Sequence, residues 1–328
     1  VANTGGNCRL TMDVAPALSP DGTKMIFLSS RDLFTTDVYL VDLRNGKLSK
    51  IVSESSNPHA DALRYVNSAG SWSPDGKYFA FVGYESGNDR LAILDVARED
   101  IIMTITIPTV GAISNPSWSP DGKKIVFSGS VGGISDLFLY DLAEQKSQRL
   151  TNDRYADLQP VYSPDGNTIA FVSDRGTVTD FASLKYGEPT ISLLALPTLS
   201  ITQLDPFIGG KAINPMYAPD GKSLYVIADP DGYSDLYQVN LADRRTTRIT
   251  NVATGVSGIT GISPAMSVAR NTGELAFSVF TDGGYTIRLL PAPTPAVTMN
   301  DSAAGLTSGR TLPPPSGKDA VVGSYLND

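Results

Sequence analysis

Four residues, Ser-Pro-Asp-Gly, recur along this chain at intervals that match the size of one small β-sheet. The aspartates of five copies are separated by 54, 46, 44 and 55 residues. This period is typical of four-stranded propeller blades. A degenerate sixth copy, Asn271-Thr272-Gly273, ends 52 residues after the glycine of the fifth. The five copies are Ser19-Pro20-Asp21-Gly22, Ser73-Pro74-Asp75-Gly76, Ser119-Pro120-Asp121-Gly122, Ser163-Pro164-Asp165-Gly166 and the variant Ala218-Pro219-Asp220-Gly221.

The motif has the composition of a tight hairpin turn. Proline presets φ, aspartate suits the next position and glycine accepts positive φ. Alternating apolar residues follow each turn, as in Tyr78-Phe79-Ala80-Phe81-Val82, which indicates a second strand. The sequence therefore predicts an all-β fold, a six-bladed β-propeller of four-stranded antiparallel blades. One large residue before each turn is expected to fill the wedge between blades: Leu18, Trp72, Trp118, Tyr162, Tyr217 and Met266.

Only five outer strands are found, so the sixth blade lacks one. Residues 8–12 resemble the outer strand around Arg149 and are expected to close the ring as the missing strand of the last blade. Closure would remove an exposed strand edge. The propeller is expected over residues 1–291, and the Pro-rich residues 292–328 are expected to form an extended tail or linker.

Composition narrows the classes of partner. The chain has 328 residues, a net charge of -8 and a pI near 4.7, which argue against nucleic acid as a partner. No apolar run reaches the length of roughly 18 residues that a membrane span needs. Cys8 is the single cysteine, so no intrachain disulfide forms.

No catalytic constellation is found in the sequence. His59 is the only histidine, and Gly-x-Ser-x-Gly and His-Glu-x-x-His motifs are absent. No cofactor is expected. Calcium is a weak candidate, with Asp229, Asp231 and Asp235 as its ligands, and the alternative is that these residues form a simple turn. Aspartates also begin the third strand in three blades, where they are expected to accept hydrogen bonds from loop backbone N–H groups: Asp37, Asp136 and Asp235.

Strand alternation places the long connections 53–70 and 174–189 on the face opposite the Ser-Pro-Asp-Gly turns. This long-loop face is the expected binding surface, because it combines aromatic and charged side chains. Its candidate residues are Arg31, Asp32, His59, Asp61, Arg64, Tyr65, Tyr155, Asp157, Arg175, Tyr186, Lys211 and Tyr233. Three amides that precede prolines are expected near the mouth of the central channel, to bind an inserted peptide or to order water: Asn115, Gln159 and Asn214.

The repeat resembles that of TolB-type propellers, most completely over residues 117–165. Three stretches, 31–34, 65–72 and 253–260, are similar to TolB-like propellers within large bacterial outer-membrane-associated proteins, some of which continue into a BamA-type barrel. The resemblance implies a periplasmic, extracellular or cell-surface location in a bacterium. It also implies a protein or peptide partner, such as an outer-membrane protein or a lipoprotein. The separate N-terminal α/β domain of TolB has no counterpart in these residues.

Three functions remain open at this point. The first is a non-catalytic propeller of the bacterial envelope or cell surface that binds a protein or peptide on its long-loop face. The second is the gating propeller of a prolyl oligopeptidase-like peptidase. The third is a calcium-dependent hydrolase of a small molecule or sugar that works in the channel.

Overall fold

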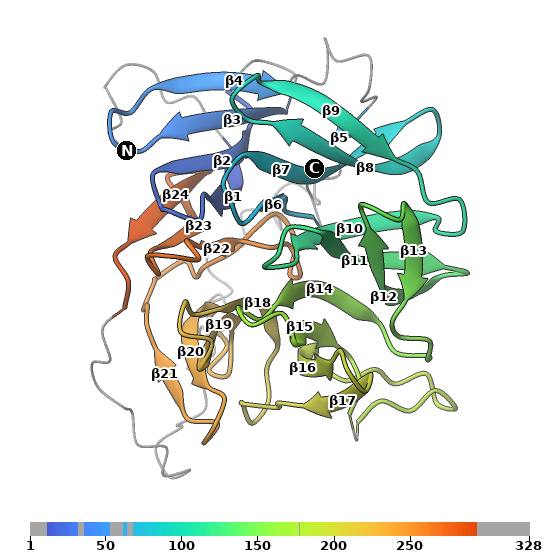
Figure 1. Cartoon of the computed structure of the whole chain (residues 1–328). Helices are drawn as coiled ribbons and strands as arrows, with labels where there is room; N and C mark the ends of the chain where they lie inside the picture. Colours follow the sequence, from blue (N-terminus) through green and yellow to red (C-terminus); the bar gives the residue numbers. More distant parts are fainter. Residues whose placement is uncertain (1–11, 32–35, 53–61, 64–67, 177, 294–328) are drawn as a thin grey trace, which may run out of the picture.

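The repeat folds into a ring of six small antiparallel sheets. The computed structural model describes residues 12–31, 36–52, 62–63, 68–176 and 178–293. Within these ranges the regular secondary structure consists of 24 strands in six sheets, which Figure 1 shows arranged around a centre. The prediction of an all-β six-bladed propeller is confirmed.

Each sheet is one blade, numbered in chain order. Blade 1 contains β1 (Asp13–Leu18), β2 (Lys24–Ser29), β3 (Asp37–Asp42) and β4 (Leu48–Val52). Blade 2 contains β5 (Ala62–Leu63), β6 (Ser71–Trp72), β7 (Tyr78–Glu85), β8 (Asn88–Asp95) and β9 (Asp100–Ile105). Blade 3 contains β10 (Ala112–Trp118), β11 (Lys124–Val131), β12 (Ile134–Asp141) and β13 (Lys146–Arg149).

The second half of the ring repeats this pattern. Blade 4 contains β14 (Asp157–Tyr162), β15 (Thr168–Ser173), β16 (Thr190–Ala195) and β17 (Ser200–Gln203). Blade 5 contains β18 (Ala212–Tyr217), β19 (Ser223–Ala228), β20 (Asp235–Asn240) and β21 (Thr246–Arg248). Blade 6 contains β22 (Met266–Val268), β23 (Leu275–Thr281) and β24 (Gly284–Leu290).

The Ser-Pro-Asp-Gly motifs are the hairpin tips between first and second strands. In blade 3, Gly122 has φ +71° and its N–H donates to the carbonyl of Ser119 at 2.9 Å. The Ser119 hydroxyl donates to the Asp121 carboxylate at 2.6 Å and accepts from the Lys124 N–H at 2.9 Å. Serine and aspartate therefore fix the turn from within, while glycine supplies the positive φ that other residues adopt at a cost.

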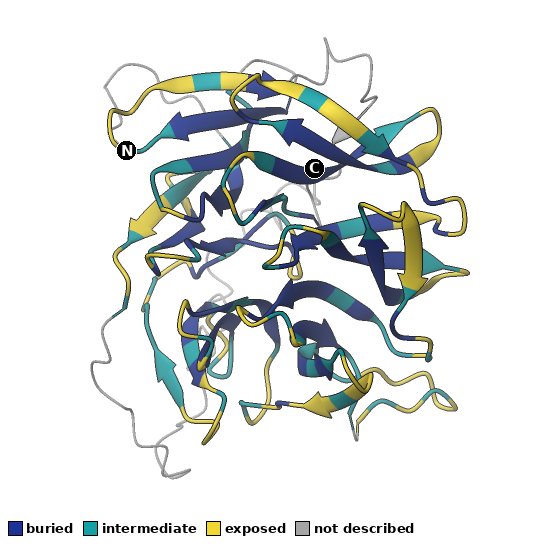
Figure 2. Cartoon of the chain, in the orientation of Figure 1, coloured by how far each residue is buried: buried dark blue, intermediate teal, exposed yellow. Residues whose placement is uncertain are grey.

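The core lies between neighbouring blades. Second and third strands are mostly buried in blades 1 to 5, whereas outer strands and β24 of blade 6 carry exposed residues (Figure 2). The large residues before the turns are buried as predicted in blades 1 to 5. In blade 6 the pairing Val268↔Leu275 matches Leu18↔Met25 of blade 1, so Val268 holds this position. The assignment of Met266 to it was wrong by two residues.

The innermost strands face the channel as sheet edges, and prolines occur along them. In four blades a proline follows a residue with positive φ at a β-bulge: Ala15-Pro16, Asn115-Pro116, Gln159-Pro160 and Asn214-Pro215. Proline has no N–H to leave unpaired on the channel side, which suits it to an edge strand.

Blade 6 has three strands in the part of the chain that the structure describes. Four of the five residues predicted to supply its fourth strand, 8–11, lie outside that part. Met12 forms an isolated parallel bridge with Tyr285 of β24, so the start of the described chain lies at the outer edge of blade 6. Ring closure by residues 8–12 stays a prediction.

Candidate functional site

The long-loop face is formed by connections between blades and by loops between second and third strands. Seven of the twelve predicted binding residues lie in the described structure: Arg31, Tyr155, Asp157, Arg175, Tyr186, Lys211 and Tyr233. The other five, Asp32, His59, Asp61, Arg64 and Tyr65, lie outside the described residues. The structure brings four of the seven together in blade 4 and distributes the rest over blades 1 and 5.

Arg175 is the centre of the blade 4 group. It follows β15, and its Nη2 donates to both carboxylate oxygens of Asp157, at 2.6 and 2.8 Å. Its Nη1 lies 3.1 Å from the carboxylate of Asp153, in the connection between blades 3 and 4. Asp157 also accepts a hydrogen bond from the hydroxyl of Ser173 at 2.8 Å. One guanidinium thereby joins the blade-to-blade connection to the long loop 174–189.

Aromatic rings extend this group toward the surface. The ring of Tyr155 lies 5.2 Å from that of Phe181, which in turn lies 6.4 Å from the ring of Tyr186. The guanidinium of Arg175 lies over Tyr155, 5.0 Å from its centroid, and that of Arg154 lies 4.5 Å from the centroid of Phe181. Alternating cations and rings hold the long loop in place. Sequence reasoning did not identify Phe181 or Arg154.

Electrostatics at Asp157 favour a structural role. The carboxylate is buried, and desolvation raises its pKa to about 6, although the hydrogen bonds and charge of Arg175 act to lower it. Its oxygens are occupied by Arg175 and Ser173. Buried Asp157 and half-buried Arg175 thus support this part of the surface from below.

Alternate blades repeat a second buried ion pair at the start of the third strand. Asp136 pairs with Arg149, and Asp235 pairs with Arg248. In blade 1, Lys50 lies 3.4 Å from Asp37. Of the predicted backbone donors, the Val252 N–H donates to Asp235 at 3.0 Å, whereas Asp136 is held by the side chains of Arg149 and Thr151. The cationic partners of these aspartates from the outer strands were not predicted, although the matching sequences Arg-Leu-Thr and Arg-Ile-Thr signal them.

The weak calcium candidates are each paired with a cation. Asp229 lies 3.7 Å from the Lys211 ammonium, Asp231 accepts from Arg248 at 2.8 Å, and Asp235 pairs with the same guanidinium. Among the described residues, the carboxylates that converge within 4.8 Å are instead Asp136, Asp153 and Asp157. Arg149 pairs with Asp136, and Arg175 pairs with Asp153 and Asp157, so the group forms an ion-pair network.

The remaining predicted residues lie apart from this group. Arg31 pairs with Asp13 at 2.8 Å and lies over the ring of Phe27, which gives it the same structural place in blade 1 that Arg175 has in blade 4. Tyr233, in the β19–β20 loop, is 44% exposed. The long-loop face of blades 4 to 6 also exposes apolar side chains that the sequence did not single out: Val178, Leu184, Ile208, Ile262 and Phe280.

The opposite face, which carries the Ser-Pro-Asp-Gly turns, has two grooves. A groove of ≈ 650 Å³ lies between the turns of blades 2 and 3, and its rim includes the exposed side chains of Ile102 and Met103. A second groove of ≈ 530 Å³ lies between blades 3 and 4 beside Leu199. Each groove is lined by two neighbouring turns and by an outer strand.

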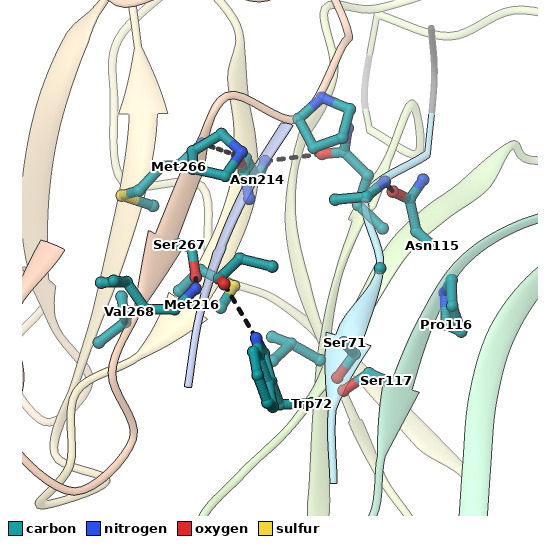
Figure 3. Close-up of a pocket in the computed structure, with 18 of the residues that line it drawn as sticks. Ser71, Trp72, Asn115, Pro116, Ser117, Asn214, Met216, Met266, Ser267 and Val268 are labelled. Carbon is teal, nitrogen blue, oxygen red and sulfur yellow. Dashed lines mark hydrogen bonds between the residues drawn. The ribbon is translucent and has the colours of Figure 1, made fainter. Parts of the chain in front are cut away.

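The predicted channel amides line the central cavity (Figure 3) and connect its blades. The Asn214 N–H donates to Gln159 Oε1 at 2.7 Å, and Asn214 Oδ1 accepts from the N–H groups of Ala265 and Met266, both at 2.8 Å. Asn115 Oδ1 accepts from the Ala69 N–H at 3.1 Å. The cavity measures ≈ 80 Å³, which is room for a few waters and too little for a peptide.

No helix in the described part of the chain has the length and hydrophobicity that would allow it to cross a membrane. Residues 63–181 match the family described as the TolB beta propeller domain. TolB from Acinetobacter baumannii is similar in structure, with a TM-score of 0.61 and 19% identity over 88% of this chain. The chain spans 62% of the length of that protein. The fold is that of a six-bladed β-propeller and is similar to that of TolB.

Enzymes share the same fold. An oligogalacturonate lyase from Vibrio parahaemolyticus matches with a TM-score of 0.56 and 13% identity, over 87% of this chain and 91% of that protein. The propeller domain of the Trilobed protease from Pyrococcus furiosus, which has an open velcro topology, matches with a TM-score of 0.52 and 13% identity, over 86% of this chain and 85% of that domain. At these identities the likeness concerns the fold alone, and activity depends on the residues of each protein.

Proposed function

We propose that this propeller is a non-catalytic binding module of the bacterial envelope or cell surface, which binds a protein or peptide through the long-loop face of blades 4 to 6. The observation that carries the proposal is the exposure of apolar side chains around a rigid, ion-paired support. Ile208 is 85%, Leu184 70% and Tyr186 59% exposed. Aromatic and apolar anchors beside arginines are the residues that dominate binding energy at protein interfaces.

Rigidity of the support favours a binding role. Tyr186 contacts Phe181, which packs on Tyr155, and Tyr155 lies beside the Arg175–Asp157 pair. A preorganised surface loses less conformational entropy when a partner docks. The envelope location, and a partner such as an outer-membrane protein or lipoprotein, follow from the likeness to TolB. Association with a BamA-type barrel stays a prediction of the sequence resemblance.

The two enzymatic alternatives have weaker support in the described residues. A channel hydrolase needs space and free polar groups, but the cavity is ≈ 80 Å³ and its three amides are engaged between blades. The peptidase alternative has the support of the fold, because the propeller of a protease matches it. A binding face on the propeller is compatible both with a separate binding module and with the propeller of a peptidase.

The test compares variants on the two faces of the ring, with one matched apolar-to-acidic substitution on each face. Immobilised wild-type protein is incubated with detergent-solubilised bacterial envelope, and retained proteins are compared with those retained by Ile208→Glu, by Tyr186→Ala and by the control Met103→Glu in the opposite groove. We expect one partner to be retained by wild type and Met103→Glu, and reduced at least about tenfold by the other two variants, since an anchor contributes 2 kcal/mol or more. Loss with Met103→Glu alone would move the site to the turn face.

A further inference from the structure

The sixth turn differs from the other five at the position of the motif proline. The N–H of Ala269 donates to the carbonyl of Glu274, as the N–H of Ser19 donates to that of Lys24 in blade 1. Arg270 therefore occupies the position of the motif proline, held in blade 1 by Pro20. The glycine of this turn comes one residue later, at Gly273, where φ is +81°. One blade of six thus carries a cation where the others carry a proline.

Arg270 reaches across the central channel. Its Nη2 donates to the backbone carbonyl of Trp118 at 3.2 Å. Trp118 ends the innermost strand of blade 3, which lies opposite blade 6 in a ring of six. Arg270 also lines the central cavity, together with Pro20 and Ser117. The guanidinium consequently spans the turn-face end of the channel.

The charge of Arg270 has no carboxylate partner among the described residues. Its one hydrogen bond there is to the Trp118 carbonyl, although a guanidinium has five N–H donors. Burial alone lowers its pKa to about 10, with no contribution from a charged neighbour. The group stays cationic at neutral pH, and the side chain is partly buried at the wall of the cavity. Three other partly buried arginines, 149, 175 and 248, all pair with aspartates.

We propose that the turn-face end of the channel binds a small anion of single charge, such as chloride or a short carboxylate, at Arg270. The cavity of ≈ 80 Å³ admits an anion of that size and excludes a folded or extended chain. The prolines on the inner strands have no backbone N–H that could donate to an anion. Arg270 supplies the charged donor of the site. A bound anion would compensate the guanidinium and connect blade 6 to the opposite side of the ring.

Chloride relaxation tests this directly. The ³⁵Cl NMR line of sodium chloride is recorded with wild type, with Arg270→Met, and with the control Arg245→Met, whose arginine is on the surface. We expect excess line broadening with wild type and Arg245→Met, its reversal by added acetate, and at least a fivefold smaller excess with Arg270→Met. Equal broadening with all three proteins would overturn the proposal.

Thermal unfolding is a second measurement. It compares Tm between salts for each protein, so a variant whose basal Tm is lower can still be tested. Tm is measured in sodium chloride, sodium acetate and sodium gluconate at equal ionic strength. A ligand that binds only the folded state raises Tm, and we expect chloride and acetate to raise it by at least about 3 °C over gluconate in wild type and Arg245→Met. The increment should vanish in Arg270→Met. An increment that is unchanged in Arg270→Met would contradict the assignment.

Discussion

At the scale of single residues, all four positions of a Ser-Pro-Asp-Gly turn help to stabilise it. Serine and aspartate form hydrogen bonds, and proline and glycine favour the φ angles that the turn needs. The sequence identified the roles of proline and glycine, because these restrict or extend φ on their own. The hydrogen bonds of Ser119 and Asp121 needed coordinates, since their acceptors and donors lie up to five residues away. The sequence did not identify Arg270 for a related reason. Gly273 comes one residue later than the glycine of the other turns, and this hides the alignment of Arg270 with the motif prolines.

Asp157 gives a prediction at this scale. Its pKa is raised by burial to about 6, above the ordinary value of 3.8, so the folded state binds its proton more tightly than the unfolded state does. Its contribution to stability is therefore fully present below about pH 4 and is lost as pH rises through 6. The free energy of unfolding of wild type, minus that of Asp157→Asn, should fall by about 2 kcal/mol between pH 4 and pH 7.

Urea unfolding of both proteins at pH 4, 5, 6 and 7 measures this difference. Other carboxylates titrate in the same range, but they contribute equally to both proteins and cancel in the subtraction. A difference that stays constant with pH would show that Arg175 keeps the pKa of Asp157 near or below its ordinary value. Asp220→Asn, at an exposed turn, is the control and should leave the pH dependence of wild type unchanged.

At the scale of strands, blade 2 departs from the pattern because its innermost strand is divided into β5 and β6. Strand positions after the turns could be predicted from runs of apolar residues, which second and third strands require when both faces are buried. The division could not, because it depends on contacts between segments. Gly70 lies just before β6, and a Cβ built there would approach the ring of Phe79 to 2.1 Å and the carbonyl of Ala80 to 2.8 Å.

Gly70→Ala should therefore destabilise the protein. The methyl group must displace a buried ring and a backbone carbonyl, and overpacking of this kind costs about 1–3 kcal/mol. Gly111→Ala is the matched control, since a Cβ there meets the Ser130 carbonyl at an ordinary 3.6 Å. Chemical denaturation should show a lower midpoint for Gly70→Ala and a midpoint near wild type for Gly111→Ala. Equal midpoints would mean that the Gly70 segment adjusts freely.

At the scale of the whole molecule, the period of the motif was sufficient to predict the ring, because six blades of this size close on themselves. The binding surface was only partly predictable. The sequence placed the long loops on one face through strand alternation, and Arg175, Asp157, Tyr155 and Tyr186 do meet there. The grooves of the opposite face form between side chains of neighbouring blades, and such contacts have no periodic signal in the sequence.

Ring closure leads to the last prediction. In the described part of the chain β24 pairs on one side with β23, and its other side meets Met12 in a single bridge. If residues 8–12 form the fourth strand, deletion of residues 1–11 removes several backbone hydrogen bonds, each worth about 1 kcal/mol net, and reopens a sheet edge. We expect Tm to fall by roughly 5 °C or more, with aggregation on heating. Deletion of residues 294–328 is the control, and equal Tm values for the two truncated proteins would exclude closure by the N-terminal strand.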